Sequence, residues 1–100
     1  MKNIKNDIQI LINLFNVAKF DLVVIKAKKL IRKYPEYVIL YNLLGSAYQN
    51  IGNFNLAKNI FIKGYKMDPK NIAIMNNLAN VYKNTDEIHL SENLFDKIIT

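Results

Sequence analysis

The feature of this chain that most limits its possible folds is an internal repeat with a period of 34 residues. Apolar, aromatic and proline residues recur in sets whose neighbouring members differ by 34 positions: Phe20, Phe54 and Ile88; Leu14, Tyr48 and Tyr82; Ile10, Leu44 and Leu78; Pro35 and Pro69. A period of this length is typical of a solenoid built from helix–turn–helix units. Each unit of a solenoid mainly contacts its neighbours, and the stack forms a long concave surface. The repeat therefore indicates a scaffold for binding.

The composition fits one small domain with a packed core. The chain has 100 residues, of which 51% are hydrophobic, and this length is enough for a single domain only. It contains no cysteine, which excludes disulfides, thiolate catalysis and cysteine-ligated zinc. The sequence has neither the pattern of a signal peptide nor a run of about 20 apolar residues that could span a membrane. We therefore expect a cytoplasmic protein.

The chain is basic, with a net charge of +6, and basic chains can bind nucleic acid, anionic membranes or acidic partners. It is also rich in Ile, Asn and Lys, whose codons are rich in A and T, so a biased genome would account for much of the lysine excess. Lys29, Lys63 and Lys97 recur at the repeat period and would form a basic ridge on the convex face. That ridge could meet phosphates or anionic lipid, or it could simply be a solvated face. We expect the solvated face, and no nucleic-acid or membrane partner.

Apolar residues recur at helical spacing almost throughout, which predicts six helices of about 12 to 14 residues joined by short turns. The predicted breaks are at Val17–Lys19, Tyr34–Pro35, Gly52–Asn53, Asp68–Pro69 and Asn84–Asp86. Pro35 and Pro69 suit the first position of a helix, where no N–H is needed. Residues expected to cap the fourth, fifth and sixth helices at their N-termini are Asn53, Asp68 and Asp86. Gly52 suits the left-handed conformation that ends a helix.

Residues 38–71 resemble a tetratricopeptide (TPR) repeat at nearly every position of that family's pattern. The matching residues are Tyr41, Leu44, Gly45, Tyr48, Phe54, Ala57, Phe61 and Pro69, and the one departure is Gly64, a small residue where the pattern has Ala. Residues 72–100 match in part, as an incomplete unit, and residues 4–37 form a degenerate unit in which Asp7 replaces the aromatic residue. The resemblance implies an all-α fold: one array over residues 1–100, in which about three units and six antiparallel helices form a right-handed α-solenoid.

In the TPR family the first helix of each unit lines the concave side, which implies a peptide-binding groove. The expected groove residues are Ile8, Ile12, Phe15, Asn42, Leu43, Ser46, Gln49, Asn76, Asn77, Asn80, Lys83 and Asn84. The amides among them could bond the backbone of an extended polypeptide whatever its side chains, or they could only solvate the groove. The row resembles the asparagine-lined superhelix of TPR-bearing glycosyltransferases. Asn77 occupies the ladder position of that family, whereas Leu43 takes the equivalent place one unit earlier.

These observations favour a non-catalytic protein–protein interaction scaffold over an enzyme. The chain lacks a base–nucleophile pair and a glycine-rich phosphate loop, and its one histidine, His89, is too little for a metal site. We therefore expect no catalytic residue, metal or cofactor, and a protein or peptide ligand as partner. The alternative is a substrate-presenting or oligomerisation module that precedes a glycosyltransferase or sulfotransferase domain. Phe95, Ile98 and Ile99 have no successor to cover them, so we expect the chain to continue past Thr100 or to dock through its C-terminal helix.

Overall fold

The computed structural model describes residues 4–99, and all six expected helices lie within them. The helices are α1 (Ile4–Asn16), α2 (Phe20–Lys33), α3 (Val38–Ile51), α4 (Phe54–Met67), α5 (Ile72–Asn84) and α6 (Ile88–Ile99). Their lengths of 12 to 14 residues agree with the prediction. Thr100, the last residue of the expected third unit, lies outside the described residues. The all-α fold predicted from the repeat is confirmed.

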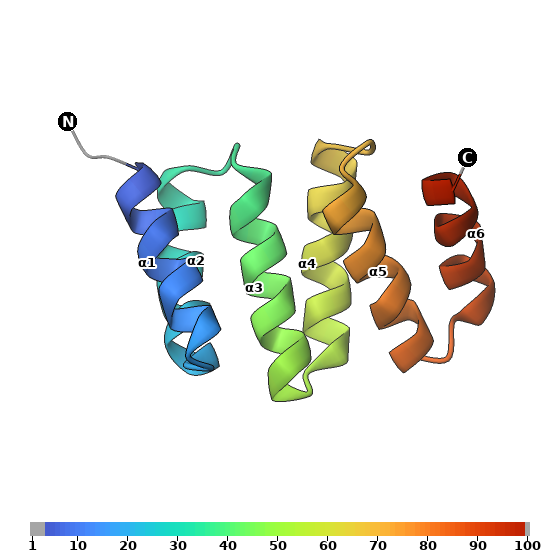
Figure 1. Cartoon of the computed structure of the whole chain (residues 1–100), viewed down its shortest axis with the longest axis horizontal. Coiled ribbons are helices and arrows are strands. Elements are labelled where there is room, and N and C mark those ends of the chain that lie inside the picture. Colours follow the sequence, from blue (N-terminus) through green and yellow to red (C-terminus); the bar gives the residue numbers. More distant parts are fainter. Residues whose placement is uncertain (1–3, 100) are drawn as a thin grey trace.

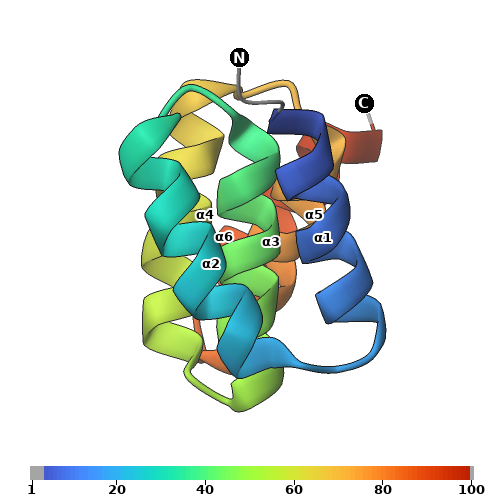
Figure 2. The ribbon, with the colours of Figure 1, turned by 90° about the vertical axis from the view of Figure 1, so that its left-hand side faces the viewer.

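The helices pack in chain order along the long axis of a molecule that measures 43 × 25 × 20 Å (Figure 1). Viewed along that axis, α2 and α4 lie on one side and α1 and α5 on the other (Figure 2). Within the described residues, α3 approaches both α1 and α5, whereas α2 and α4, like α4 and α6, have no Cα atoms within 8 Å of each other. Neighbouring helices are closest on the inner side of a curved stack. The concave side is therefore formed by α1, α3 and α5.

The core consists of two clusters that meet at one tyrosine. The first joins α1, α2 and α3, the second joins α4, α5 and α6, and Tyr48 packs against both. Leu44 and Leu78, one period apart, are each 2% exposed, whereas Ile10, the corresponding residue of the degenerate first unit, is 45% exposed. Each pair of helices thus buries its apolar face against the next pair, as a solenoid requires.

The degenerate first unit replaces an aromatic contact with an ion pair. Tyr41 of the second unit is buried, and its hydroxyl donates to the carbonyl oxygen of Pro35 at 3.0 Å. Asp7, at the equivalent position of α1, instead lies 3.7 Å from the Nζ of Lys26 on α2. The other carboxylate oxygen of Asp7 is buried and has no hydrogen-bond partner among the described residues. A partly buried ion pair with an unsatisfied oxygen adds little to the stability of the fold. The interface between α1 and α2 is also smaller than those between α3 and α4 and between α5 and α6.

Small residues allow α3 and α4 to approach closely. Gly45 of α3 faces the ring of Phe61 on α4, which is fully buried. A Cβ atom built on Gly45 would lie 2.6 Å from Cδ1 and 2.8 Å from Cζ of that ring, and closer still to Cε1. Any larger side chain at this position would have to push the two helices apart.

Two of the predicted helix-end residues act as expected. Gly52 ends α3 with φ 95° and ψ 8°, the left-handed conformation that a side chain disfavours. Asn53 precedes α4, and its side-chain oxygen accepts a hydrogen bond from the N–H of Leu56 at 3.4 Å. The turn between α3 and α4 was therefore predictable from its own residues.

The predictions for the two proline turns were wrong. Pro35 and Pro69 do not begin α3 and α5, because these helices begin three residues later. A proline forces the residue before it into an extended conformation, so Asp68, with φ −143°, ends α4 instead of capping α5. The cap of α5 is Asn71, whose side-chain oxygen accepts from the N–H of Ile74 at 3.1 Å.

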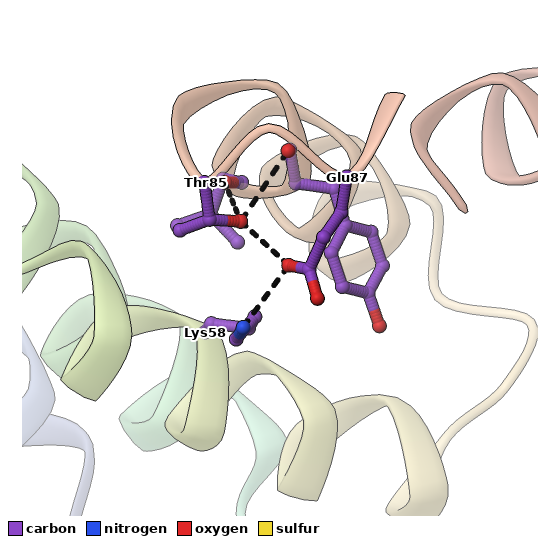
Figure 3. A network of polar contacts seen from close by, with 5 residues as sticks. Lys58, Thr85 and Glu87 are labelled. Atoms are coloured by element: carbon purple, nitrogen blue, oxygen red, sulfur yellow. Dashed lines mark hydrogen bonds and ion pairs between the residues drawn. The ribbon is translucent and has the colours of Figure 1, made fainter. Parts of the chain in front are cut away.

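Asp86 was also wrongly predicted as a cap. Its φ of 61° places it in the left-handed region, inside the turn between α5 and α6. Glu87 holds this turn instead, since its carboxylate accepts from the Thr85 hydroxyl at 2.6 Å and pairs with Lys58 of α4 at 3.0 Å (Figure 3). The Thr85 hydrogen bond, followed by the one from Lys58, lowers the pKa of Glu87. The contact links the second unit to the third.

Candidate peptide-binding face

The expected groove residues lie on the three helices of the concave side. The half-buried ones are Ile8, Ile12 and Phe15 on α1, Asn42, Leu43, Ser46 and Gln49 on α3, and Asn76 and Asn77 on α5. The exposed ones are Asn80, Lys83 and Asn84, all on α5. We call this set of residues the concave face. Side chains of this kind remain partly open to solvent and can contact a ligand.

The central feature of the concave face is a hydrogen bond between two helices. Nδ2 of Asn77 on α5 lies 2.6 Å from Oδ1 of Asn42 on α3. The two residues are 35 positions apart, one more than the repeat period, so the position equivalent to Asn77 is Leu43 and not Asn42. Sequence reasoning placed both asparagines on this face, and only packing could pair them.

Two polar side chains, Asn50 on α3 and Lys83 on α5, already have contacts within the fold. On α3, the carbonyl oxygen of Ser46 accepts a hydrogen bond from the side chain of Asn50 at 2.8 Å, so Asn50 bonds its own helix. On α5, the Nζ of Lys83 lies 4.9 Å from the centre of the Phe95 ring, so this cation is directed towards α6. Asn76 and Asn80 lie on α5 within one helical turn of Asn77. The polar part of the concave face is therefore centred on α3 and α5.

The α1 end of the face is apolar and partly occupied by the fold itself. Ile8, Phe15 and Leu43 pack against the N-terminal core cluster. The ring of Phe15 also meets that of Phe20 edge to face, with centroids 5.1 Å apart. Among the described residues, Ile12 is in neither cluster. Of the four apolar residues expected in the groove, Ile12 is thus the least engaged in packing.

The predicted basic ridge is divided between different surroundings. Lys97 donates to the Tyr65 hydroxyl at 3.3 Å and lies over the same ring. Lys63 lines a hollow between α2 and α4, and Lys29 lines a second hollow on α2. The three lysines therefore do not form one uniform row of cations.

Residues 4–99 contain neither a membrane-spanning helix nor a cluster of metal-binding side chains. None of the helices there is long and apolar enough to cross a membrane. Within the same range, no three His, Cys, Asp or Glu side chains lie close enough together to hold a metal ion. His89 is exposed on α6.

Comparisons with known proteins agree with the geometry. Residues 38–71 match the family model described as tetratricopeptide repeat. No curated protein matches the sequence. These comparisons give no support to the expected similarity to glycosyltransferase or sulfotransferase arrays.

Solved structures match the whole fold at low sequence identity. The type III secretion chaperone SycD of Yersinia enterocolitica, solved with a peptide of the translocator YopD, superimposes with a TM-score of 0.89 at 18% identity, over 97% of this chain and 76% of SycD. A MamA structure labelled AMB-1 gives 0.84 at 23%, over 97% of this chain and 57% of the other. MamA of Desulfovibrio magneticus RS-1 gives 0.82 at 20%, over 86% and 49%.

The chain thus spans about half to three fifths of the MamA structures that it matches. At these identities the likeness to MamA and SycD shows the fold alone. The repeat match at residues 38–71 adds the family signature to that fold. Six helices stacked in pairs, with one unit at their centre that matches the tetratricopeptide repeat, give this chain a fold similar to those of MamA and SycD.

Proposed function

We propose that the chain is a protein-interaction module that holds an extended polypeptide segment on its concave face. The observation that supports this most directly is the Asn77–Asn42 hydrogen bond, which joins the amides of two units into one polar surface. A side-chain amide has two donors and an acceptor with two lone pairs. After the mutual bond, each amide keeps donors and acceptors that can meet the N–H and C=O groups of a peptide backbone.

The affinity would come from several weak bonds and not from one strong site. A net hydrogen bond contributes about 0.5–1.5 kcal/mol, so three such bonds give about 1.5–4.5 kcal/mol. Asn76, Asn77 and Asn80 lie within two turns of α5 and supply this number of amides. Ile12, at the other end of the face, would add apolar contact. The chaperone SycD, whose fold is similar, was solved with a bound peptide, and that precedent is consistent with the proposal.

The test uses a peptide selected from a random, unstructured library displayed on phage, with the chain as bait. Replacing Asn76, Asn77 and Asn80 with Ala should lower the affinity for the selected peptide by about tenfold or more. The matched control replaces Asn55, Asn59 and Asn93, exposed asparagines on α4 and α6, and should leave the affinity within about twofold, well below the tenfold that each 1.4 kcal/mol represents. Equal affinity in both triple variants, at similar melting temperatures, would refute the role of the concave amides.

A further inference from the structure

A second surface of the molecule has the features of a binding groove, on the face opposite the concave one. Because α2 and α4 do not approach each other, they leave a hollow of about 230 Å³ above α3. Its apolar lining includes the buried Leu44 and the half-buried Ile31, Tyr48 and Ile60. The volume is below the roughly 300–1,000 Å³ of pockets that enclose small molecules. It suits side chains of a partner better than a cofactor.

Three cations surround this apolar floor. Lys28 and Arg32 are one helical turn apart on α2, and Lys63 stands opposite them on α4. No carboxylate lines the hollow. Within residues 4–99, none of these three side chains has a hydrogen bond or an ion pair. An apolar floor with unpaired positive charge on both sides calls for a ligand with apolar and acidic groups.

The repeat supplies an internal comparison for this groove. The hollow between α4 and α6 is lined at equivalent positions 34 residues later, and there Lys28 is replaced by Ile62. Arg32 corresponds to Lys66, which does not line the second hollow. Lys63 corresponds to Lys97, which is already bonded to a tyrosine hydroxyl. The cluster of free cations is therefore specific to the groove between α2 and α4, and is not a property of every unit.

The apolar and basic surface continues across α2. Lys28 and Arg32 also line a neighbouring hollow together with Val24 and Ile25. Ile25 is 57% exposed, which leaves a large apolar side chain in water beside two cations. A ligand that covered both hollows would bury this side chain as well.

We propose that the groove between α2 and α4 docks an acidic amphipathic helix of a partner protein. The groove runs between two helices, and a helix with apolar residues on one face could lie in it, as in other helix-in-groove complexes. Acidic residues flanking that face would meet the cations, whose spacing of one turn on α2 matches acidic residues one turn apart. Single-stranded nucleic acid fits less well, since it needs exposed aromatic faces. Tyr41 at this site is buried, with its hydroxyl bonded to Pro35, and the half-buried Tyr48 packs against both core clusters.

The experiment uses a synthetic helical peptide of about four turns, with leucines along one face and glutamates on both flanks. The variant Arg32→Glu with Lys63→Glu replaces two of the three cations of the groove with carboxylates and so reverses the charge there. Its matched control, Lys66→Glu with Lys97→Glu, makes the same change of net charge at the equivalent positions. Reversing the charge of the groove should lower the affinity for the peptide by about tenfold or more. The control variant should lower this affinity by about twofold or less. Amide NMR shifts of the labelled chain should change on α2 and α4.

Several outcomes would overturn the proposal. They are equal weakening in both double variants, shift changes confined to α1, α3 and α5, or unchanged binding of a peptide whose glutamates are all replaced by glutamine. Saturable binding of phosphatidylserine vesicles or of poly(U) through the same residues, tighter than that of the acidic peptide, would also overturn it. The partner would then be a membrane or a nucleic acid. Circular dichroism checks the fold of each variant. If reversal unfolds the chain, Arg32→Gln with Lys63→Gln replaces it, and unchanged affinity for the acidic peptide then decides against the groove.

Discussion

Replacing Gly45 with alanine should destabilise the fold, although alanine normally stabilises a helix. Gly45 lies inside α3, and its missing side chain makes room for the fully buried ring of Phe61 on α4. An added Cβ would come within 2.8 Å of Cζ and closer to two other ring atoms, distances that real Cβ atoms do not show. The ring is fully buried and cannot turn out into solvent, so we expect the two helices to separate.

The expected magnitude follows from two opposing effects. Overpacking a core usually costs about 1–3 kcal/mol, and three simultaneous clashes with a rigid ring point to the upper end. Alanine gains about 1 kcal/mol over glycine in a helix interior. The free energy of unfolding should therefore fall by about 2 kcal/mol, which lowers the melting temperature of a domain of this size by about 8–16 °C.

Urea unfolding followed by circular dichroism measures this change, and Gly64→Ala is the matched control. Gly64 lies on α4, and a Cβ there would be 2.9 Å from Cδ1 of Ile74. That atom ends its side chain, so rotation of the last bond can move it aside, and the next atom, Cγ1 of Ile74, is 3.1 Å from the added Cβ. The gain in helix propensity then offsets most of the steric penalty, and Gly64→Ala should stay within about 1 kcal/mol of the natural protein.

A double-mutant cycle tests the stated cause. On a Phe61→Leu background the clashing ring is gone, so Gly45→Ala should cost less than in the natural protein by about 1 kcal/mol or more. The reasoning is refuted if Gly45→Ala alone leaves the unfolding free energy unchanged, or if its cost is the same with leucine at position 61.

Three further predictions concern turns and pH. Asn71→Ala removes the cap of α5 and should lower the unfolding free energy by about 1 kcal/mol, whereas Asp68→Ala should lower it by less than half as much; urea midpoints compare them. Gly52→Ala meets no atom within 4 Å but must adopt a φ of 95°, so calorimetry should show a loss of about 1–2 kcal/mol. The hydrogen bonds from Thr85 and Lys58 lower the pKa of Glu87 in the folded state, and Glu87→Gln removes the stabilisation that the charged carboxylate supplies. This stabilisation should be complete above the ordinary carboxyl pKa of about 4.3 and should disappear as the pH falls through the lower folded value. A stability difference that does not shrink as the pH falls below about 4.3 would contradict this account.

Much of the fold could be predicted because the repeat is a local property. Each unit must bury its apolar face against the next one, so residues such as Leu44 and Leu78 recur at the period and are buried alike. The helix bounds at Gly52 and Asn53 were also predictable, since Gly52 acts through its own backbone and the side chain of Asn53 bonds an N–H only three residues along the chain. The proline turns were not, because Pro35 and Pro69 fit either the start of a helix or the turn before it, and the sequence pattern does not distinguish the two.

The sequence by itself determined the six helices, their pairing and the residues that could face the concave side, since these depend on periodicity along one chain. Only the tertiary structure decided which of them meet. Asn42 and Leu43 both border the concave side, and the rotation of α3 against α5 selects Asn42 as the partner of Asn77. In the same way, Lys28, Arg32 and Lys63 surround one hollow only because α2 and α4 stand apart. Contacts between helices depend on how the helices are placed relative to one another, and the spacing of residues along the chain does not fix that placement.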